Sequence, residues 1–380
     1  MNEHGLAAAP TRRLTVVQCV PALRGGGVER GTLEISRALI ERGHRSIVIS
    51  AGGRMVEQLT REGGEHVEWP IGRKSLLTLR LVGRVRTFCA REGVDILHAR
   101  SRAPAWVCLL AWRRMSPDDR PRFVTTMHGV HSISRYSEVM TRGERVIAVS
   151  ETIRRHIADA YPRADQSRIV VIPRGVDSAE FPYGHRPSPA WLETAERELP
   201  AARGRRLALL PGRVTRLKGH ADAVRAVALA HRAGVDIHLL IVGGVDPKKE
   251  SLRSETEGIA RSEGVADRVT FVGHRSDIRE WMAACDVTLA CSTQPESFGR
   301  TALEAIKLGK PVIGYDHGGV GEVLGQIFPQ GLVAPSDWRA MGERLIEFLT
   351  TPPLVAETSE FTLRAMQDRT LALYEGLARG

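Results

Sequence analysis

The sequence predicts an α/β protein made of two doubly wound domains in tandem. Short β-branched or apolar segments alternate with segments of helical periodicity along most of the 380 residues, a pattern typical of parallel sheets with helices on both faces. The alternation restarts near residue 205, after a proline-rich stretch, and this length suits two domains better than one. We therefore expect the ligand site in a cleft between the two domains.

The expected elements follow from the periodicity. Strands are expected at 14–20, 46–50, 95–98, 123–126, 146–149 and 169–172, and then at 207–210, 238–242, 269–272, 287–290 and 311–315. Helical periodicity is clearest at 33–42 and 221–233, and the last periodic segment, 361–377, has no strand after it. We expect a first domain over 1–180, a linker over 181–204, a second domain over 205–355 and a C-terminal helical segment over 356–380.

The net charge is concentrated in one half of the chain. The sequence has 54 basic and 44 acidic side chains, a net charge of +10. Residues 1–175 hold 29 basic and 17 acidic side chains (+12), whereas residues 176–380 hold 25 and 27 (−2). The net charge alone would suit nucleic acid, an anionic membrane or a phosphorylated small molecule. Its location leaves the first half for a larger anionic acceptor or the membrane that carries it.

Other features narrow the class of protein. No stretch approaches 18 uninterrupted apolar residues, and residues 1–13 lack the apolar core of a secretory signal. The five cysteines never form a C-x-x-C pair, which argues against a disulfide framework or a zinc knuckle and favours a reducing compartment. We expect a cytoplasmic protein.

Two loops carry residues suited to phosphate. Gly25, Gly26 and Gly27 follow the first strand and precede a helix, where the backbone can approach a phosphate closely; a plain tight turn is the alternative, and the spacing is not that of a dinucleotide fingerprint. Arg213 and Lys218 lie on the loop after strand 207–210. They could clamp a diphosphate or be solvated charges.

A third loop carries two carboxylates. Glu296 and Glu304 are eight positions apart and enclose a glycine-containing loop at the end of strand 287–290. The N–H groups between them and the Thr301 hydroxyl could receive phosphate or sugar oxygens. The alternative is that one carboxylate caps the helix and the other lies on the surface.

Two histidines end neighbouring strands of the first half. His128 follows strand 123–126; a lone histidine is usually structural, and the position at a strand end adds sugar binding or proton handling as the functional alternative. His98 ends the preceding strand in the same way.

Together these motifs resemble those of glycosyltransferase family 4 (group 1), retaining transferases of the GT-B fold. The matches run in family order from about residue 18 to 335 and comprise Gly26-Gly27-Val28-Glu29, Thr126-Met127-His128-Gly129, Pro173-Arg174-Gly175-Val176-Asp177, Gly212-Arg213 with Lys218-Gly219, Glu296 with Glu304, and Gly318-Gly319 with Glu322-Val323. Two positions depart from the family pattern: Arg174 stands where Asn is usual, and Ser297 where Gly is common.

The resemblance implies a division of roles. Arg213 and Lys218 would hold the nucleotide diphosphate, Glu304 the ribose hydroxyls and Glu296 the donor sugar. The remaining implied donor contacts are His128 on the sugar, Gly26 and Gly27 on the diphosphate, Gly273 and His274 beside the base, and the backbone of Phe298, Gly299, Arg300 and Thr301 on phosphate and sugar oxygens. No metal or cofactor is implied, and the C-terminal helix would pack back onto the first domain.

The acceptor is expected at the basic first domain. Residues 73–91 read as a basic amphipathic helix that could lie on anionic lipid or pack into the core. The stretch 128–145 resembles a bacterial branch acting on lipopolysaccharide core or related cell-envelope glycans. We expect a phosphorylated or lipid-linked glycan acceptor at the cytoplasmic face of the inner membrane. Alternatives are a GT-B sugar-nucleotide hydrolase or epimerase and, disfavoured by 5% aromatic content and the lack of any motif, a nucleic-acid-binding protein.

Overall fold

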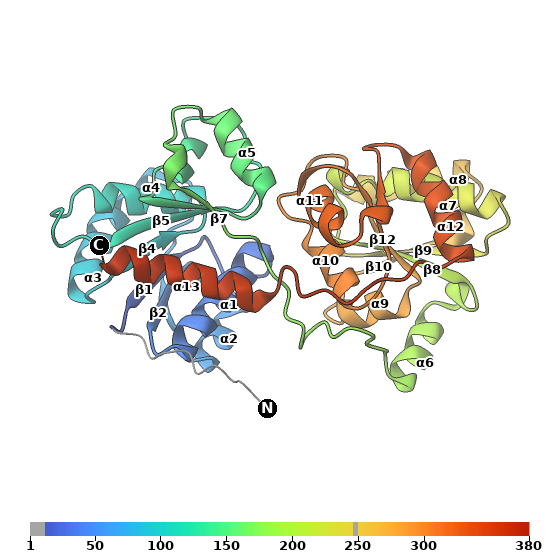
Figure 1. Ribbon diagram of the computed structural model, residues 1–380, viewed down its shortest axis with the longest axis horizontal. Helices are drawn as coiled ribbons and strands as arrows, with labels where there is room; N and C mark the ends of the chain where they lie inside the picture. The colour runs from blue at the N-terminus through green and yellow to red at the C-terminus, as the bar shows by residue number, and fades with distance from the viewer. Residues whose placement is uncertain (1–11, 246–249, 380) are drawn as a thin grey trace. The chain divides into compact units, whose positions relative to one another are not determined.

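The computed structural model describes residues 12–245 and 250–379 (Figure 1). Residues 1–11, most of the segment searched for a secretory signal, lie outside the described residues. The chain divides into two compact units. Unit 1 comprises residues 1–173 and 364–380, and unit 2 comprises residues 174–363.

Unit 1 is built on a parallel sheet of seven strands in the order β3-β2-β1-β4-β5-β6-β7. The strands are β1 (Thr15–Cys19), β2 (Arg45–Ser50), β3 (Glu65–Glu68), β4 (Ile96–Ala99), β5 (Arg122–Met127), β6 (Arg145–Ala148) and β7 (Ile169–Val171). The central strands are almost wholly buried, as parallel strands covered on both faces must be. The carboxyl ends of β1, β4 and β5 therefore lie side by side at one edge.

Helices cover this sheet. They are α1 (Gly27–Glu41), α2 (Val56–Arg61), α3 (Leu81–Arg91), α4 (Arg102–Trp112) and α5 (Glu151–Ala160). In α1, Leu33, Ile35 and Leu39 are buried and Glu29 lies in the first turn, where a carboxylate stabilises the positive end of the helix dipole. Burial of one apolar stripe thus fixes the face that each helix turns to the sheet.

The segment 73–91 is not one continuous helix. It contains a 3₁₀ turn (Leu76–Arg80) followed by α3, and Val85 and Phe88 of α3 are buried in the core of unit 1. Its arginines remain on the outside, and Arg84 stacks on the Trp69 ring at 4.7 Å. The apolar face of α3 is therefore taken up by the protein core, which is the second of the two expectations for this segment.

The C-terminal helix α13 (Leu363–Arg379) packs against the strands and helices of unit 1 through polar contacts as well as apolar ones. His98 at the end of β4 contacts the Tyr374 hydroxyl through Nδ1 (2.6 Å) and the Thr126 hydroxyl through Nε2 (2.7 Å). Gln367 donates to the Glu34 carbonyl (2.9 Å). His98 thus serves the fold of unit 1, because both of its ring nitrogens are occupied by buried partners.

Unit 2 is built on a parallel sheet of six strands in the order β10-β9-β8-β11-β12-β13. The strands are β8 (Arg206–Pro211), β9 (Ile237–Val242), β10 (Val269–Gly273), β11 (Val287–Ala290), β12 (Val312–Tyr315) and β13 (Leu332–Val333). The helices are α6 (Pro189–Glu198), α7 (His220–Arg232), α8 (Glu250–Ser262), α9 (Ile278–Ala284), α10 (Arg300–Lys307), α11 (Gly318–Ile327) and α12 (Trp338–Thr350).

The range expected as a linker, 181–204, carries helix α6 and belongs to unit 2. Ser188 caps the helix and Pro189 occupies its first turn, a favoured position for proline. Trp191 packs edge-on against Trp281 (4.8 Å between rings) and donates to Asp277 (2.8 Å). The prolines therefore mark the start of a helix and a turn, not a flexible connection.

The two sheets agree with the expected alternation, and the strands missed were the shortest or most polar. β3 reads Glu-His-Val-Glu and β13 has two residues, so neither carries an apolar run. All five cysteines are buried and free. Within 12–245 and 250–379, no helix combines the length and the apolar character needed to cross a bilayer.

Candidate functional site

An ion pair joins two loops at the carboxyl ends of neighbouring strands in unit 2. Lys218 ends the 3₁₀ turn after β8, and Glu296 lies in the loop after β11. β8 and β11 are adjacent in the sheet, so the two loops meet, and Lys218 Nζ lies 2.7 Å from Glu296 Oε1. The structure thus brings together a cation and a carboxylate that are 78 positions apart in the sequence.

Ser292 holds the Glu296 carboxylate directly, and His317 contacts Ser292. The Ser292 hydroxyl donates to Glu296 Oε1, and His317 Nε2 contacts the Ser292 carbonyl at 2.7 Å. Burial alone would raise the pKa of Glu296, but the charge and hydrogen bond of Lys218, the hydrogen bond from Ser292 and the charge of His317 outweigh it. The pKa therefore lies below its ordinary value. The carboxylate stays ionised and cannot serve as a proton donor near neutral pH.

Glycines allow the loops of this site to approach one another. Gly219 has a φ of 67°, and a Cβ there would lie 1.9 Å from the Cys291 carbonyl oxygen. Gly318 has a φ of 58°, and its Cβ would lie 2.8 Å from backbone atoms of Glu296. The backbone N–H of Gly319 donates to the Glu296 carbonyl (2.7 Å). The starts of α7 and α11 are therefore packed against the loop after β11.

Helix α10 starts within the same loop. Gly299 precedes it with a φ of 78°, and Arg300 and Thr301 form the first turn, where backbone N–H groups point along the helix axis toward its amino end. Glu304 is 5% exposed, and its carboxylate is ion-paired with Arg300 and accepts a hydrogen bond from Arg300 Nε (3.0 Å). Phe298, in the loop before α10, is buried, and its ring packs edge-on against that of Phe361. The helix start is thus fixed in place with a carboxylate one turn further on.

The other residues predicted in unit 2 lie along the same edge. Arg213 is exposed on the loop that carries Lys218 and makes no side-chain hydrogen bond or ion pair with the described residues. Gly273 ends β10 and has a φ of 82°, and the His274 side chain lies beside Gly244. β10 is two strands from β8, so these residues lie further along the edge than the ion pair.

Three predicted residues belong to unit 1. Gly26 is the N-cap of α1 with a φ of 151°, Gly27 is its first residue, and a Cβ on Gly26 would lie 2.7 Å from the Glu29 carboxylate. His128 follows β5 directly. β1 and β5 flank β4, so the glycine loop and His128 lie at the same edge of the unit 1 sheet.

Ser292 and His317 were not predicted from the sequence. Each lies two residues beyond a strand of the unit 2 sheet, β11 and β12 respectively. That position was the available signal, because the carboxyl ends of neighbouring parallel strands share one edge. The sequence does not reveal which of the polar residues there turn toward Glu296.

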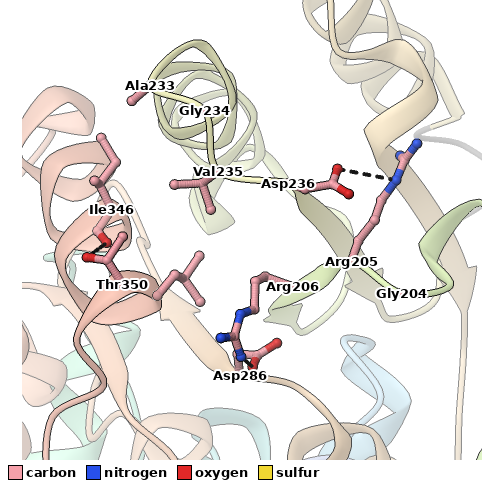
Figure 2. Close-up of a pocket in the computed structure, with 11 residues that line it drawn as sticks. Gly204, Arg205, Arg206, Ala233, Gly234, Val235, Asp236, Asp286, Ile346 and Thr350 are labelled. Atoms are coloured by element: carbon pink, nitrogen blue, oxygen red, sulfur yellow. Dashed lines mark hydrogen bonds and ion pairs between the residues drawn. The ribbon is translucent and has the colours of Figure 1, made fainter.

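A cavity in unit 2 lies apart from this site. A cavity of about 660 Å³ is lined by Arg205 and Arg206 at the start of β8, with Asp236 and Asp286 preceding neighbouring strands (Figure 2). It lies at the amino ends of the strands. Its charges are compensated: Arg206 pairs with Asp286 (3.0 Å) and Arg205 with Asp236 (3.6 Å).

Sequence comparisons identify the family over nearly the whole chain. Residues 25–180 match the model of Glycosyltransferase Family 4, and residues 193–363 match that of Glycosyl transferases group 1. The chain belongs to the family 4, group 1 glycosyltransferases. Its two doubly wound units are those of the GT-B fold.

Relatives of this glycosyltransferase act on varied substrates. The chain is 32% identical to a 2-deoxystreptamine glucosyltransferase of Streptomyces kanamyceticus over 56% of its own length, but it spans only 55% of that enzyme. It is 25% identical to the N-acetyl-alpha-D-glucosaminyl L-malate synthase of Bacillus anthracis, covering 81% of this chain and 80% of that one.

Solved structures resemble the whole chain. A glycosyltransferase from Rickettsia africae is 29% identical, with a TM-score of 0.85 over 97% of this chain and 99% of that one. Anabaena HepE, solved with UDP and glucose, is 20% identical, with a TM-score of 0.80 over 96% and 100%. WaaG, a glycosyltransferase of lipopolysaccharide biosynthesis, is 17% identical, with a TM-score of 0.63 over 96% and 94%. At such identities HepE and WaaG are similar in fold alone.

Proposed function

We propose that the protein transfers a sugar from a nucleotide-diphosphate sugar to a cell-envelope glycan, lipopolysaccharide core or a lipid-linked glycan, with retention of anomeric configuration. The observation that carries the proposal is the ion pair of Lys218 and Glu296 beside the start of α10. It places a cation, an ionised carboxylate and the first backbone N–H groups of a helix within one set of loops. The cation and the helix N–H groups match the diphosphate of the donor, and the carboxylate matches its sugar hydroxyls.

Lys218 and Arg213 are proposed to carry the transition-state charge. When the bond between the anomeric carbon and the phosphate oxygen breaks, its electron pair stays with the nucleoside diphosphate, which gains negative charge. Arg213 is exposed with no partner among the described residues, and Lys218 retains 23% side-chain exposure. Both are therefore open to a diphosphate, and fixed cations that meet developing charge lower the barrier. We propose that they do so without a metal ion.

Glu296 and Glu304 are proposed to recognise hydroxyls. An ionised carboxylate accepts two hydrogen bonds from neighbouring hydroxyls, as in ribose recognition. Glu304, held by Arg300, would accept the ribose hydroxyls, and Glu296, held by Lys218 and Ser292, those of the donor sugar. From unit 1, His128 would contact the sugar and Gly26 and Gly27 the diphosphate. Gly273 and His274 would lie beside the base.

The acceptor proposal rests on charge. Unit 1 holds the basic half of the chain, and Leu77 and Leu79 are 60% and 50% exposed among Arg73, Lys74 and Arg80. Exposed leucines among cations suit the surface of an anionic bilayer. We propose peripheral contact with the cytoplasmic face of the inner membrane at this turn, and no binding of nucleic acid.

A thermal-shift screen against sugar nucleotides tests the donor assignment. A ligand that binds only the folded protein raises its unfolding midpoint, so one nucleotide sugar should raise it in the wild type and not in Lys218→Ala. Equal shifts in both proteins would contradict the site. NMR of the glycoside product then reads its anomeric configuration, and inversion would contradict retention.

Two further measurements separate the alternatives. Donor turnover that needs no acceptor would indicate a hydrolase or epimerase instead of a transferase. Sedimentation with phosphatidylglycerol vesicles at low salt tests the membrane contact, and Leu77→Ser/Leu79→Ser should reduce it. Unchanged sedimentation of that variant would place the contact elsewhere.

A further inference from the structure

A second cavity, of about 530 Å³, lies wholly within unit 1. It is formed by the C-terminal half of α4, the 3₁₀ turn Ser137–Thr141 with its flanking residues, and the end of α5. Four arginines line it: Arg113, Arg135, Arg142 and Arg163. We name it the arginine pocket.

Most of the positive charge of the arginine pocket has no counter-charge. Its one carboxylate, Glu138, is ion-paired with Arg142. Arg113, Arg135 and Arg163 are exposed, and their side chains form no hydrogen bond or ion pair with residues in the described ranges. This distinguishes the pocket from the unit 2 cavity, where the arginines face aspartates (Figure 2). Three guanidinium groups around one hollow are suited to phosphate oxygens.

The pocket also presents aromatic surface. Trp106, which is half-buried, donates from its indole N–H to the Tyr136 carbonyl (2.9 Å), which fixes the ring, whereas Tyr161 is buried in the core at 6% exposure and adds little surface. Both residues line the pocket. Rigid aromatic rings can pack against the apolar C–H face of a sugar ring. The combination of arginines and aromatic rings fits a phosphorylated sugar better than a bare phosphate.

The arginine pocket is separate from the strand edge that carries Gly26 and His128. α4 starts just after the carboxyl end of β4, and α5 just after that of β6. Helices of parallel α/β units run back across the sheet, so Arg113 and Arg163, beyond the ends of these helices, lie toward the amino ends of the strands. The pocket lies outside the family motifs of the donor site, although Arg135, Glu138, Val139 and Arg142 belong to the stretch 128–145 that resembles transferases of cell-envelope glycans.

We propose that the arginine pocket binds the phosphate groups of a phosphorylated saccharide, and that it thereby anchors the phosphorylated part of the acceptor. The anchoring of the acceptor rests on the proposed function, whereas the binding of phosphate does not. The ligand chemistry is a phosphate monoester on a sugar ring. A glycan that carries such a group away from its reacting hydroxyl would be held by that part on this flank of unit 1.

Isothermal titration calorimetry of the full chain with glucose 1,6-bisphosphate tests the binding, in a Lys218→Ala background that weakens the donor site. Arg135→Ala/Arg163→Ala should weaken binding about tenfold or more, because two charge-assisted contacts are lost. The matched control is Arg61→Ala/Arg155→Ala, which removes two exposed arginines of unit 1 outside the pocket. The dissociation constant of this control should stay within about twofold of that of the parent protein, since salt screens long-range charge.

Three results would overturn the proposal: no saturable binding to the parent protein, equal weakening in both double variants, or equal affinity for unphosphorylated glucose. A vesicle arm separates the two sources of phosphate. If Arg135→Ala/Arg163→Ala kept the bisphosphate but lost sedimentation with phosphatidylglycerol vesicles, the pocket would be a lipid contact, against the proposal. The proposed function is tested apart from this, because the same pair in the otherwise wild-type chain should retain the thermal shift given by the donor.

Discussion

Two polar clusters at strand ends differ in their exposure to solvent: one is buried under a helix and the other is accessible. In unit 1, His98 and Thr126 contact Tyr374 of α13 or one another, and each of the three is at most 3% exposed. In unit 2, Lys218 and Glu296 contact each other but keep 23% and 25% of their side-chain surface exposed. The first cluster is closed by a helix, and the second remains open to solvent. A polar residue at a strand end therefore indicates a ligand site only where no other part of the chain covers it.

The largest effect is expected at the open cluster. Lys218→Ala should lower the transfer rate at least about a hundredfold, comparable to the loss of one preorganised donor to transition-state charge. The measurement is kcat with the donor found by thermal shift. Arg216→Ala is the control, since Arg216 lies on the same turn but is 76% exposed, and it should leave the rate nearly unchanged. A near-normal rate in Lys218→Ala would remove the distinction between the two clusters.

The closed cluster should affect stability instead of rate. His98→Ala leaves the Tyr374 and Thr126 hydroxyls without their buried partner, at a cost of about 2 kcal/mol in the free energy of unfolding. Denaturant unfolding of unit 1 measures this, and Tyr374→Phe, which removes one hydroxyl, should cost about 1 kcal/mol. The transfer rate of folded His98→Ala should be unchanged. A loss of rate without a loss of stability would place His98 in the site.

A smaller change in rate is expected from the ribose contact. Glu304→Ala should lower transfer about tenfold or more by weakening the donor, because a buried carboxylate that accepts two hydroxyls is lost. We expect Glu304→Ala to raise the KM for the donor, whereas Lys218→Ala should mainly lower kcat. Glu343→Ala, an exposed acid on α12, is the matched control. An unchanged KM in Glu304→Ala would mean that its pairing with Arg300 serves the fold alone.

The smallest effect concerns pH. Burial, reinforced by nearby Arg205, lowers the pKa of His238 to about 4 in the folded state. The unfolded chain binds this proton near pH 6.5, so stability is complete above that value and falls as the pH drops toward 4. His131 and His220 also have a pKa of about 4 and act in the same direction.

His238→Gln should therefore flatten part of that decline, by on the order of 1 kcal/mol between pH 6.5 and 4.5. The amide of Gln can still meet the Thr270 hydroxyl that His238 contacts at 2.8 Å. Urea unfolding at several pH values measures the slope. If the variant kept the wild-type slope, another group would be responsible.

The fold could be predicted in large part, and the site only by motif. Alternating apolar segments predicted the central strands of both sheets to within one or two residues, since a strand buried on both faces must be apolar. They could not predict α6, because prolines are found both in connecting segments and in the first turn of a helix. The motifs selected Lys218 and Glu296. The sequence placed Ser292 and His317 only near strand ends, and nothing in it indicated that Ser292 contacts Glu296, that His317 contacts Ser292 or that Tyr374 covers His98, because these partners are brought together by tertiary packing.

The path of the chain has a consequence for biosynthesis. Segments 173–177 and 361–363 run beside each other, with Val176 paired to Thr362 and no room for a side chain on Gly175. Unit 1 is therefore assembled from two separate segments of the chain: its sheet is translated before unit 2, and α13 is translated after it. While the ribosome is still translating unit 2, the buried face that α13 will cover stays exposed, with His98 and Thr126 lacking Tyr374. The part of unit 1 that precedes unit 2 in the chain therefore lacks this cover until α13 has been translated.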